Sequence, residues 1–260
     1  MKTSSFTNKV DYFAGLRLNA GPGANFDRAY LPDSEQQAYA IQKSVMDILG
    51  KKVLGWKLGG TNPKTQTNFN CKSGYLGPIF SVSDDIPAYL DAQAPRGEAE
   101  LTFRINDKID ALDSQRIEAD PLYYFDAVYP SLEMPWSRID DFKAVGMLPL
   151  VADLCGTGHL AIGQGCSLEQ FTEQLNKQGK IAVQIKQQQN SLAQGCSDNL
   201  IGGYQTALTD FLKLVLAYHI VVEPGQLVAT GGITDCISLP LNQAVDISFT
   251  GLGSLTVCYP

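Results

Sequence analysis

The sequence predicts a mixed, β-rich α+β fold, and three observations support this class. Strand-like and helical segments follow one another irregularly, so the pattern of repeated βαβ units is missing. Strand-like segments separated by Gly and Pro turns are concentrated toward the C-terminus. The 260 residues are 44% hydrophobic and 18% charged, which is ordinary for a chain that buries a core and excludes wholesale disorder.

The chain shows no repeat, low-complexity tract or linker that would divide it. We therefore expect a single domain over residues 1–260. Within it, a helical N-terminal region (1–52) is expected to pack on a β-rich core (53–260).

Composition also limits which binding partners and which cellular compartment we expect for the protein. The net charge of −7 argues against nucleic acid as the main partner, because a phosphate backbone would be repelled on average. The six cysteines are dispersed and form no CxxC pair, which argues against a zinc ribbon and a thioredoxin-type motif. Their even number leaves disulfides open. With no apolar leader and no membrane-length apolar stretch, we expect a soluble cytoplasmic protein with reduced thiols.

The N-terminal elements are predicted from the residues that begin and end helices and from turn-forming residues. Residues 1–33 are rich in turn formers and are expected to be irregular. Ser34 and Gln37 form a capping-box pattern, apolar residues then recur at helical spacing, and Gly50 ends the helix. A strand is expected over 53–58, and the polar stretch 62–79 is interpreted as a long loop.

The remaining elements follow from periodicity. Residues 98–105 alternate as a strand, and 120–128 is interpreted as a helix. Ser167 and Gln170 form a second capping box for a short helix over 167–176, which Gly179 ends. We further expect a strand at 181–186 with a hairpin partner at 191–193, an apolar helix at 208–219, and strands near 227–230, 245–249 and 255–259.

Glu98 and Glu100 are the first candidates for chemistry. Residues i and i+2 of a strand project to the same face, so these two carboxylates converge, and an apolar continuation indicates a strand in the core. Two acids on a partly buried face favour a hard divalent cation, Mg²⁺ or Mn²⁺, between them. The alternative is a solvated face, because Glu-x-Glu alone is common.

Two further residues extend this hypothesis. Glu133 is a lone acid in an otherwise apolar run and is the leading candidate for a third carboxylate, unless it simply reaches water. Lys57 lies between Trp56 and Leu58 in an apolar strand. It either extends its ammonium group to the surface or points into a polar site, where it would bind a carboxylate or act as a base.

Several short segments, taken together, resemble one family. They occur in the same order and at similar spacings as that family's motifs, and they are residues 55–61, 98–100, 131–139, 151–153, 228–234 and 251–257. The family is that of the 2-keto-4-pentenoate hydratases and 4-oxalocrotonate decarboxylases, in the fumarylacetoacetate hydrolase superfamily. The resemblance runs from about residue 35 to the end.

The resemblance implies a β-rich fumarylacetoacetate hydrolase-like fold, a homo-oligomer, and Mg²⁺ or Mn²⁺ held by Glu98, Glu100 and Glu133. It implies a lyase acting on a small unsaturated 2-keto acid in aromatic catabolism. The first expectation is a hydro-lyase of the 2-hydroxypenta-2,4-dienoate type, and the alternative is a 4-oxalocrotonate-type decarboxylase. Lys57 would bind the substrate carboxylate or transfer a proton. The other residues expected to bind the substrate are Thr61, Asp153, Thr230 and Gly231.

The sequence departs from the family where protons are handled. Tyr75 stands where the hydratases carry an aspartate, and an unperturbed phenol, with a pKa near 10, is a poor general base at neutral pH. Tyr75 is nevertheless the predicted catalytic residue at that position. Residues 154–157 also replace the family's Asn-Ala-Ser-Ser. A protein that binds 2-keto acids without turning them over is therefore a further alternative.

Other classes of protein fit the sequence less well. Residues 156–161 match Gly-x-Gly-x-x-Ala, but Gly163 and Gly165 follow at once and no βαβ pattern surrounds them, which disfavours dinucleotide binding. No Gly-x-Ser-x-Gly nucleophile elbow occurs. The only two histidines, His159 and His219, are too few for a His-rich zinc site.

Overall fold

A computed structural model describes residues 4–19, 23–83, 86 and 95–259 and confirms the mixed α+β class. The α-helices are α1 (Phe6–Leu18), α2 (Glu35–Leu49), α3 (Pro63–Phe69), α4 (Ser114–Ala119), α5 (Phe142–Val145), α6 (Met147–Ala152), α7 (Leu168–Gln178) and α8 (Gly203–Ala217). Short 3₁₀ turns are η1 (Arg28–Tyr30), η2 (Asp107–Ala111), η3 (Pro121–Tyr124), η4 (Leu154–Gly156) and η5 (Ser197–Asn199).

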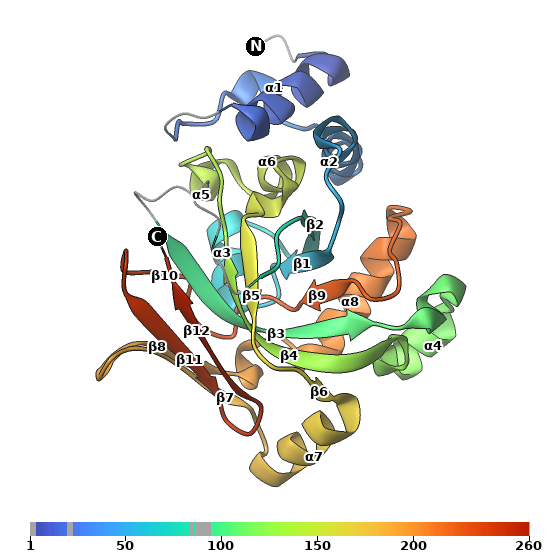
Figure 1. Cartoon of the computed structure of the whole chain (residues 1–260). Helices are drawn as coiled ribbons and strands as arrows, with labels where there is room; N and C mark the ends of the chain where they lie inside the picture. Colours follow the sequence, from blue (N-terminus) through green and yellow to red (C-terminus); the bar gives the residue numbers. More distant parts are fainter. Residues whose placement is uncertain (1–3, 20–22, 84–85, 87–94, 260) are drawn as a thin grey trace.

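The strands form two sheets (Figure 1). The larger sheet contains β1 (Gly55–Gly59), β2 (Tyr75–Ile79), β3 (Arg96–Ile105), β4 (Phe125–Met134), β5 (His159–Ile162), β6 (Cys166–Ser167), β9 (Leu227–Ala229) and β10 (Ile237–Ser238). The smaller sheet contains β7 (Ala182–Gln187), β8 (Asn190–Cys196), β11 (Ala244–Phe249) and β12 (Gly253–Cys258).

The larger sheet brings distant segments of the chain together. Its main path runs β2-β1-β9-β3-β4-β5, with β10 paired to β3 and β6 paired to β4. Within it β9 lies between β1 and β3, parallel to β1 and antiparallel to β3. The smaller sheet is antiparallel throughout, in the order β12-β11-β7-β8.

The helices cover the sheets from different sides. Helix α1 packs on α2, and α2 packs on α6, at the end of the molecule that carries the N-terminus (Figure 1). An apolar cluster that includes Phe13, Ile41 and Leu154 fills the space between them. The main core lies under α8 and contains Phe103 and Phe211, both fully buried. Among the described residues, no helix is long and apolar enough to cross a membrane.

Several sequence predictions are confirmed by these elements. Ser34 caps α2 by accepting a hydrogen bond from the backbone N–H of Gln37, and Gly50 ends the helix in the left-handed conformation. Both halves of the capping box predicted at Ser167 and Gln170 are present at the start of α7. The predicted hairpin is β7–β8, and the predicted C-terminal strands are β9, β11 and β12.

The prediction that residues 1–33 are irregular is wrong, because α1 occupies much of this segment. Ser5 caps the helix, and its buried side chains Val10, Phe13 and Ala14 follow helical spacing. They form a narrow stripe in a segment that also contains Gly15 and ends among turn formers, so the periodic signal is weak. Packing on α2 stabilises the helix, as expected where tertiary contacts outweigh local propensity.

The long loop predicted at 62–79 is also wrong. Asn62 caps α3 with Pro63 in its first turn, and β2 follows. The strand contains Gly77 and Pro78, which look like turn residues in the sequence. A proline is tolerated there because β2 is the edge strand of the sheet, where a missing N–H leaves no neighbour unpaired.

The helix predicted at 120–128 is replaced by η3 and the first half of β4. Pairing along nearly the whole of β3 determines the strand conformation, which a local pattern does not reveal. The apolar helix predicted from Leu208 begins earlier, at Gly203 in α8.

Gly77 is a position where the fold requires the absence of a side chain. A Cβ there would lie 2.5 Å from Cys155 Cβ and 2.7 Å from the carbonyl oxygen of Leu154. We therefore expect Gly77→Ala to lower the free energy of unfolding by about 1–3 kcal/mol, the usual cost of overpacking. Denaturant unfolding measures this. In the matched control Gly74→Ala the nearest atom would be 3.5 Å away, and this variant should stay near the wild type. Equal stability of the two variants would contradict the expectation.

Candidate metal centre

The larger sheet brings three glutamates together. Glu98 and Glu100 share one face of β3, and antiparallel pairing places Glu133 of β4 directly opposite Glu98. One carboxylate oxygen from each lies within 4.8 Å of the others. Residues far apart in the sequence thus meet at the separation that a single cation can span.

These carboxylates lie in an unfavourable environment for negative charge. Glu100 and Glu133 are 0% and 1% exposed, and Glu98 is partly exposed. Two like charges 4 Å apart repel by about 4 kcal/mol at an effective dielectric constant of 20. Burial, and then the charge of Glu133, raise the pKa of Glu98 to about 7. Burial and the charge of Glu98 raise the pKa of Glu100 well above its usual value.

Lys57 of β1 supplies one positive charge to this cluster. Its side chain is buried, and Nζ lies 2.5 Å from Oε1 of Glu133. Of the two alternatives open for this lysine, extension to the surface is wrong. Burial alone would lower the pKa of Lys57, but the charge and hydrogen bond of Glu133, together with the charges of Glu98 and Glu100, outweigh it and hold the pKa above its usual value. The ammonium form is therefore the stable one.

The lone pairs left over define a site for a further ligand. Gly231 donates its N–H to Oε2 of Glu100 at 2.7 Å. Within the described part of the chain, Glu100 Oε1, Glu133 Oε2 and Thr61 Oγ1 are buried without a hydrogen-bond partner. Buried acceptors normally have partners, and an unpaired one signals a missing ion or water. An all-oxygen set of hard donors with excess negative charge fits Mg²⁺ or Mn²⁺.

The glycines after β9 allow the chain to approach the carboxylates closely. Gly231 has φ +95°, and a Cβ there would lie 1.9 Å from Thr61 Oγ1. A Cβ on Gly232 would lie 2.2 Å from Glu98 Oε2. Asn62, the cap of α3, donates from its side chain to the carbonyl of Gly232 at 3.0 Å. The close approach therefore favours glycine at positions 231 and 232. These two residues lie between Thr61 and Asn62, which follow β1, and the carboxylate of Glu98.

Two other predicted site residues, Thr230 and Tyr75, lie beside this cluster in different surroundings. Thr230 is fully buried and donates its hydroxyl to the carbonyl of Leu101 at 2.9 Å. Tyr75 lies in β2 with its ring against Gly59, where a Cβ would be 2.5 Å from the tyrosine hydroxyl. Burial raises the pKa of Tyr75 well above its ordinary value, so its hydroxyl stays protonated. Their roles toward a substrate remain predictions.

Asp153 is held by a residue that the sequence interpretation missed. Its carboxylate accepts hydrogen bonds from Arg17 Nε at 2.8 Å, Arg17 Nη2 at 2.9 Å and Ser137 Oγ at 2.6 Å. Arg17 belongs to α1, in the segment predicted to be irregular, and no motif marks it. Its ion pair spans 136 positions of sequence.

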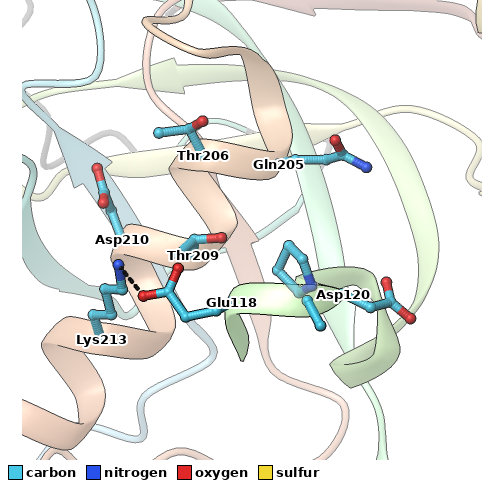
Figure 2. A pocket seen from close by; sticks show the side chains of 9 residues that line it. Glu118, Asp120, Gln205, Thr206, Thr209, Asp210 and Lys213 are labelled. Carbon is cyan, nitrogen blue, oxygen red and sulfur yellow. Dashed lines mark ion pairs between the residues drawn. The ribbon is translucent and has the colours of Figure 1, made fainter. Parts of the chain in front are cut away.

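A separate pocket of about 430 Å³ lies between α4 and α8 (Figure 2). Its lining is mainly polar, and Figure 2 shows the ion pair between Glu118 and Lys213, whose Nζ–Oε1 distance is 2.6 Å. Both side chains are more than half exposed. Exposed acids have their charge satisfied by water, so this pocket lacks the unpartnered buried oxygens that distinguish the three glutamates.

Comparison with curated proteins finds similar sequences. The chain is 22% identical over 240 residues to 2-keto-4-pentenoate hydratase 2 of Dechloromonas aromatica (strain RCB), covering 90% of this chain and 88% of that protein. It is 23% identical over 229 residues to 4-oxalocrotonate decarboxylase of Pseudomonas putida, covering 84% and 83%. No family model matches the chain. Both relatives are enzymes, and the matches confirm the resemblance inferred from the motifs.

Solved structures share the fold. The 4-oxalocrotonate decarboxylase from Pseudomonas putida G7, complexed with magnesium and adipate, superposes with a TM-score of 0.82 at 19% identity over 100% of both chains. Fumarylpyruvate hydrolase from Pseudomonas aeruginosa, in complex with Mn²⁺ and pyruvate, gives a TM-score of 0.53 at 12% identity, covering 80% of this chain and 89% of that one. The fold expected from the resemblance is confirmed.

Buried carboxylates make the stability of the metal-free protein depend on pH. The pKa of Glu98 rises from 4.5 to about 7 on folding, so between these values the folded state binds more protons than the unfolded state. Stability should therefore fall as pH rises from 4.5 to about 7. Unfolding in the presence of a chelator measures this slope. Glu98→Gln should make the slope shallower, with Glu100 and Glu133 contributing the rest, whereas Glu173→Gln, at an exposed site on α7, should leave it unchanged. An unaltered slope in Glu98→Gln would contradict the assignment.

Proposed function

We propose that this chain belongs with the 2-keto-4-pentenoate hydratases and 4-oxalocrotonate decarboxylases that it resembles, and that it is a divalent-metal-dependent lyase for a small unsaturated 2-keto acid. The reaction proposed first is hydration of the 2-hydroxypenta-2,4-dienoate type. The observation that carries the proposal is the cluster of Glu98, Glu100 and Glu133, in which buried oxygens of Glu100 and Glu133 are left without a partner beside Lys57.

The three glutamates would hold Mg²⁺ or Mn²⁺, in agreement with their oxygen donors and with the metals named in the similar structures. When bound, this ion supplies a Lewis acid that stabilises negative charge on the keto acid end of the substrate. The protein would contribute a largely buried site on paired strands. Because Glu98 and Glu133 face each other on paired strands, their separation is set by the sheet and not by flexible loops.

Lys57 would bind and orient the substrate carboxylate. Its ammonium group is held in place by Glu133 and stays protonated, so it offers a positive charge and a proton donor instead of a base. The unpartnered Thr61 Oγ1 and the Gly231 backbone line the same region and would complete the binding surface.

Tyr75 favours decarboxylation as the second candidate reaction. Its raised pKa makes the phenol a hydrogen-bond donor and not a general base. Hydration needs water to be activated and a carbon to be protonated, whereas loss of CO₂ needs mainly an electron sink. The homo-oligomer expected from the family remains a prediction.

The proposal is tested by turnover. The protein is incubated with Mg²⁺ or Mn²⁺ and either 2-hydroxypenta-2,4-dienoate or 2-oxohex-3-enedioate, and loss of the conjugated chromophore and release of CO₂ are followed. Chromophore loss without CO₂ supports hydration, and CO₂ release supports decarboxylation. Metal-dependent binding of the acids without product would favour the alternative that the protein binds 2-keto acids without turning them over. Absence of both binding and turnover would refute the proposal.

We expect Glu133→Gln to abolish Mn²⁺ binding and turnover, because an amide keeps the shape of the side chain but loses the charge that the ion requires. Calorimetry or electron paramagnetic resonance measures Mn²⁺ binding. The matched control is Glu118→Gln, which lies in the pocket between α4 and α8 and should bind Mn²⁺ as the wild type does. Tight binding by the Glu133 variant would remove this residue from the metal site.

Lys57→Ala should distinguish metal binding by the glutamates from substrate binding by the lysine. We expect it to spare Mn²⁺ binding, since the three carboxylates remain, and to lower kcat/KM about a hundredfold or more. Steady-state kinetics and Mn²⁺ titration measure the two effects. The control is Lys64→Ala, an exposed lysine paired with Asp235 outside the cluster. Unchanged kinetics in the Lys57 variant would exclude the role assigned to it.

A further inference from the structure

Arg17 is a buried arginine whose hydrogen-bonding capacity is entirely used. Its side chain is 4% exposed. Nε and Nη2 bind the carboxylate of Asp153, Nη2 also donates to the Asp153 carbonyl, and Nη1 donates to the carbonyls of Trp136 at 3.0 Å and Thr157 at 2.9 Å. A guanidinium has five N–H donors, so none is left for a substrate. Arg17 therefore acts on the protein itself.

The turn that Arg17 holds has a strained backbone. Leu154 and Cys155 both have φ +55°, and Gly156 follows with φ +63°. Non-glycine residues rarely adopt this conformation and persist in it only where the surroundings enforce it. Arg17 binds the chain immediately before this turn, at Asp153, and immediately after it, at Thr157. It is thus well placed to enforce the turn.

The turn packs beside Lys57, on the face of the sheet to which the lysine side chain projects. Gly77 is paired with Lys57 across β1 and β2, and the Cβ of Cys155 and the carbonyl of Leu154 press against Gly77 so closely that no side chain fits there. Burial raises the pKa of the Cys155 thiol to about 12, and the charge of Lys57 acts against this rise. The turn and the lysine are therefore close enough to interact electrostatically.

The same turn also holds the end of the strand that carries Glu133. Trp136 donates its N–H to the carbonyl of Gly156 at 2.8 Å, and its own carbonyl is bound by Arg17. A Cβ on Gly158 would lie 2.2 Å from the carbonyl of Met134, the residue after Glu133. The strands that carry Lys57 and Glu133 thus both pack against the turn that Arg17 holds.

We propose that Arg17 is a positioning residue that makes helix α1 part of the active site, by fixing the turn 153–157 that aligns Lys57 with Glu133. This inference rests on the proposed function. It assigns Asp153 to the same device, since its carboxylate is engaged by Arg17 and Ser137. The N-terminal helix then determines the geometry of the metal site without supplying a ligand to it.

The test measures Mn²⁺ affinity, kcat and KM of the full-length protein with Arg17→Ala. We expect Mn²⁺ affinity to fall about tenfold, because Glu133 loses the support at the end of β4 that holds it in place, and we expect a lower kcat because Lys57 is no longer aligned with it. Guanidinium chloride at millimolar concentrations, below those that affect unfolding, should restore part of both, whereas NaCl at equal ionic strength should not. The matched control is Arg28→Ala, an exposed arginine with one hydrogen bond to a carbonyl.

A second variant guards against loss of folding. Arg17→Lys keeps a positive charge for Asp153, but a single ammonium group cannot reach the carboxylate and both carbonyls, so Mn²⁺ affinity should again fall. Wild-type Mn²⁺ affinity in either folded variant would overturn the inference. Failure of both variants to fold would overturn it too, because Arg17 would then have a purely structural role. If wild-type protein itself binds no Mn²⁺, the proposed function fails instead.

Discussion

The arrangement of the molecule depends on one electrostatic constraint: three carboxylates must meet in a place that water barely reaches. Such a cluster is costly unless positive charge enters it, because burial and mutual repulsion act in the same direction. Lys57 supplies part of that charge, and the raised pKa of Glu98 shows that it does not supply all of it. A dication held by the three carboxylates, as proposed above, would supply the remainder.

The sheet satisfies this constraint through its strand order. Glu98 and Glu100 share a face of β3, β4 brings Glu133 opposite, and β9 carries Gly231 to the free side of Glu100. Side chains on adjacent strands are held at fixed spacing, so the site needs no induced ordering of the glutamates. The loop after β9 contributes close backbone approach, which is why glycines stand there.

Strand periodicity alone predicts the positions of Glu98 and Glu100, whereas the positions of Glu133 and Arg17 depend on tertiary contacts. The period of two in β3 is enough to place Glu98 and Glu100 on one face. Glu133 was suggested by its apolar surroundings and by resemblance, while the local pattern just before it wrongly favoured a helix, because strand pairing and not propensity determines β4. Arg17 had no local signal, since its partners lie more than 115 positions away.

Because β9 lies between β1 and β3, the larger sheet can be completed only after β9 has been synthesised. Leu227–Ala229 enters between β1 and β3, and both of those strands are made long before it emerges from the ribosome. Until then β1 and β3 have open edges facing each other, and the acidic residues of β3 lack the backbone N–H of Gly231. Contacts of such wide sequence separation form slowly, and exposed strand edges invite association with other chains. A nascent or truncated chain lacking residues 227–259 would therefore be prone to aggregate, because the last eighth of the chain is needed to close the sheet between β1 and β3.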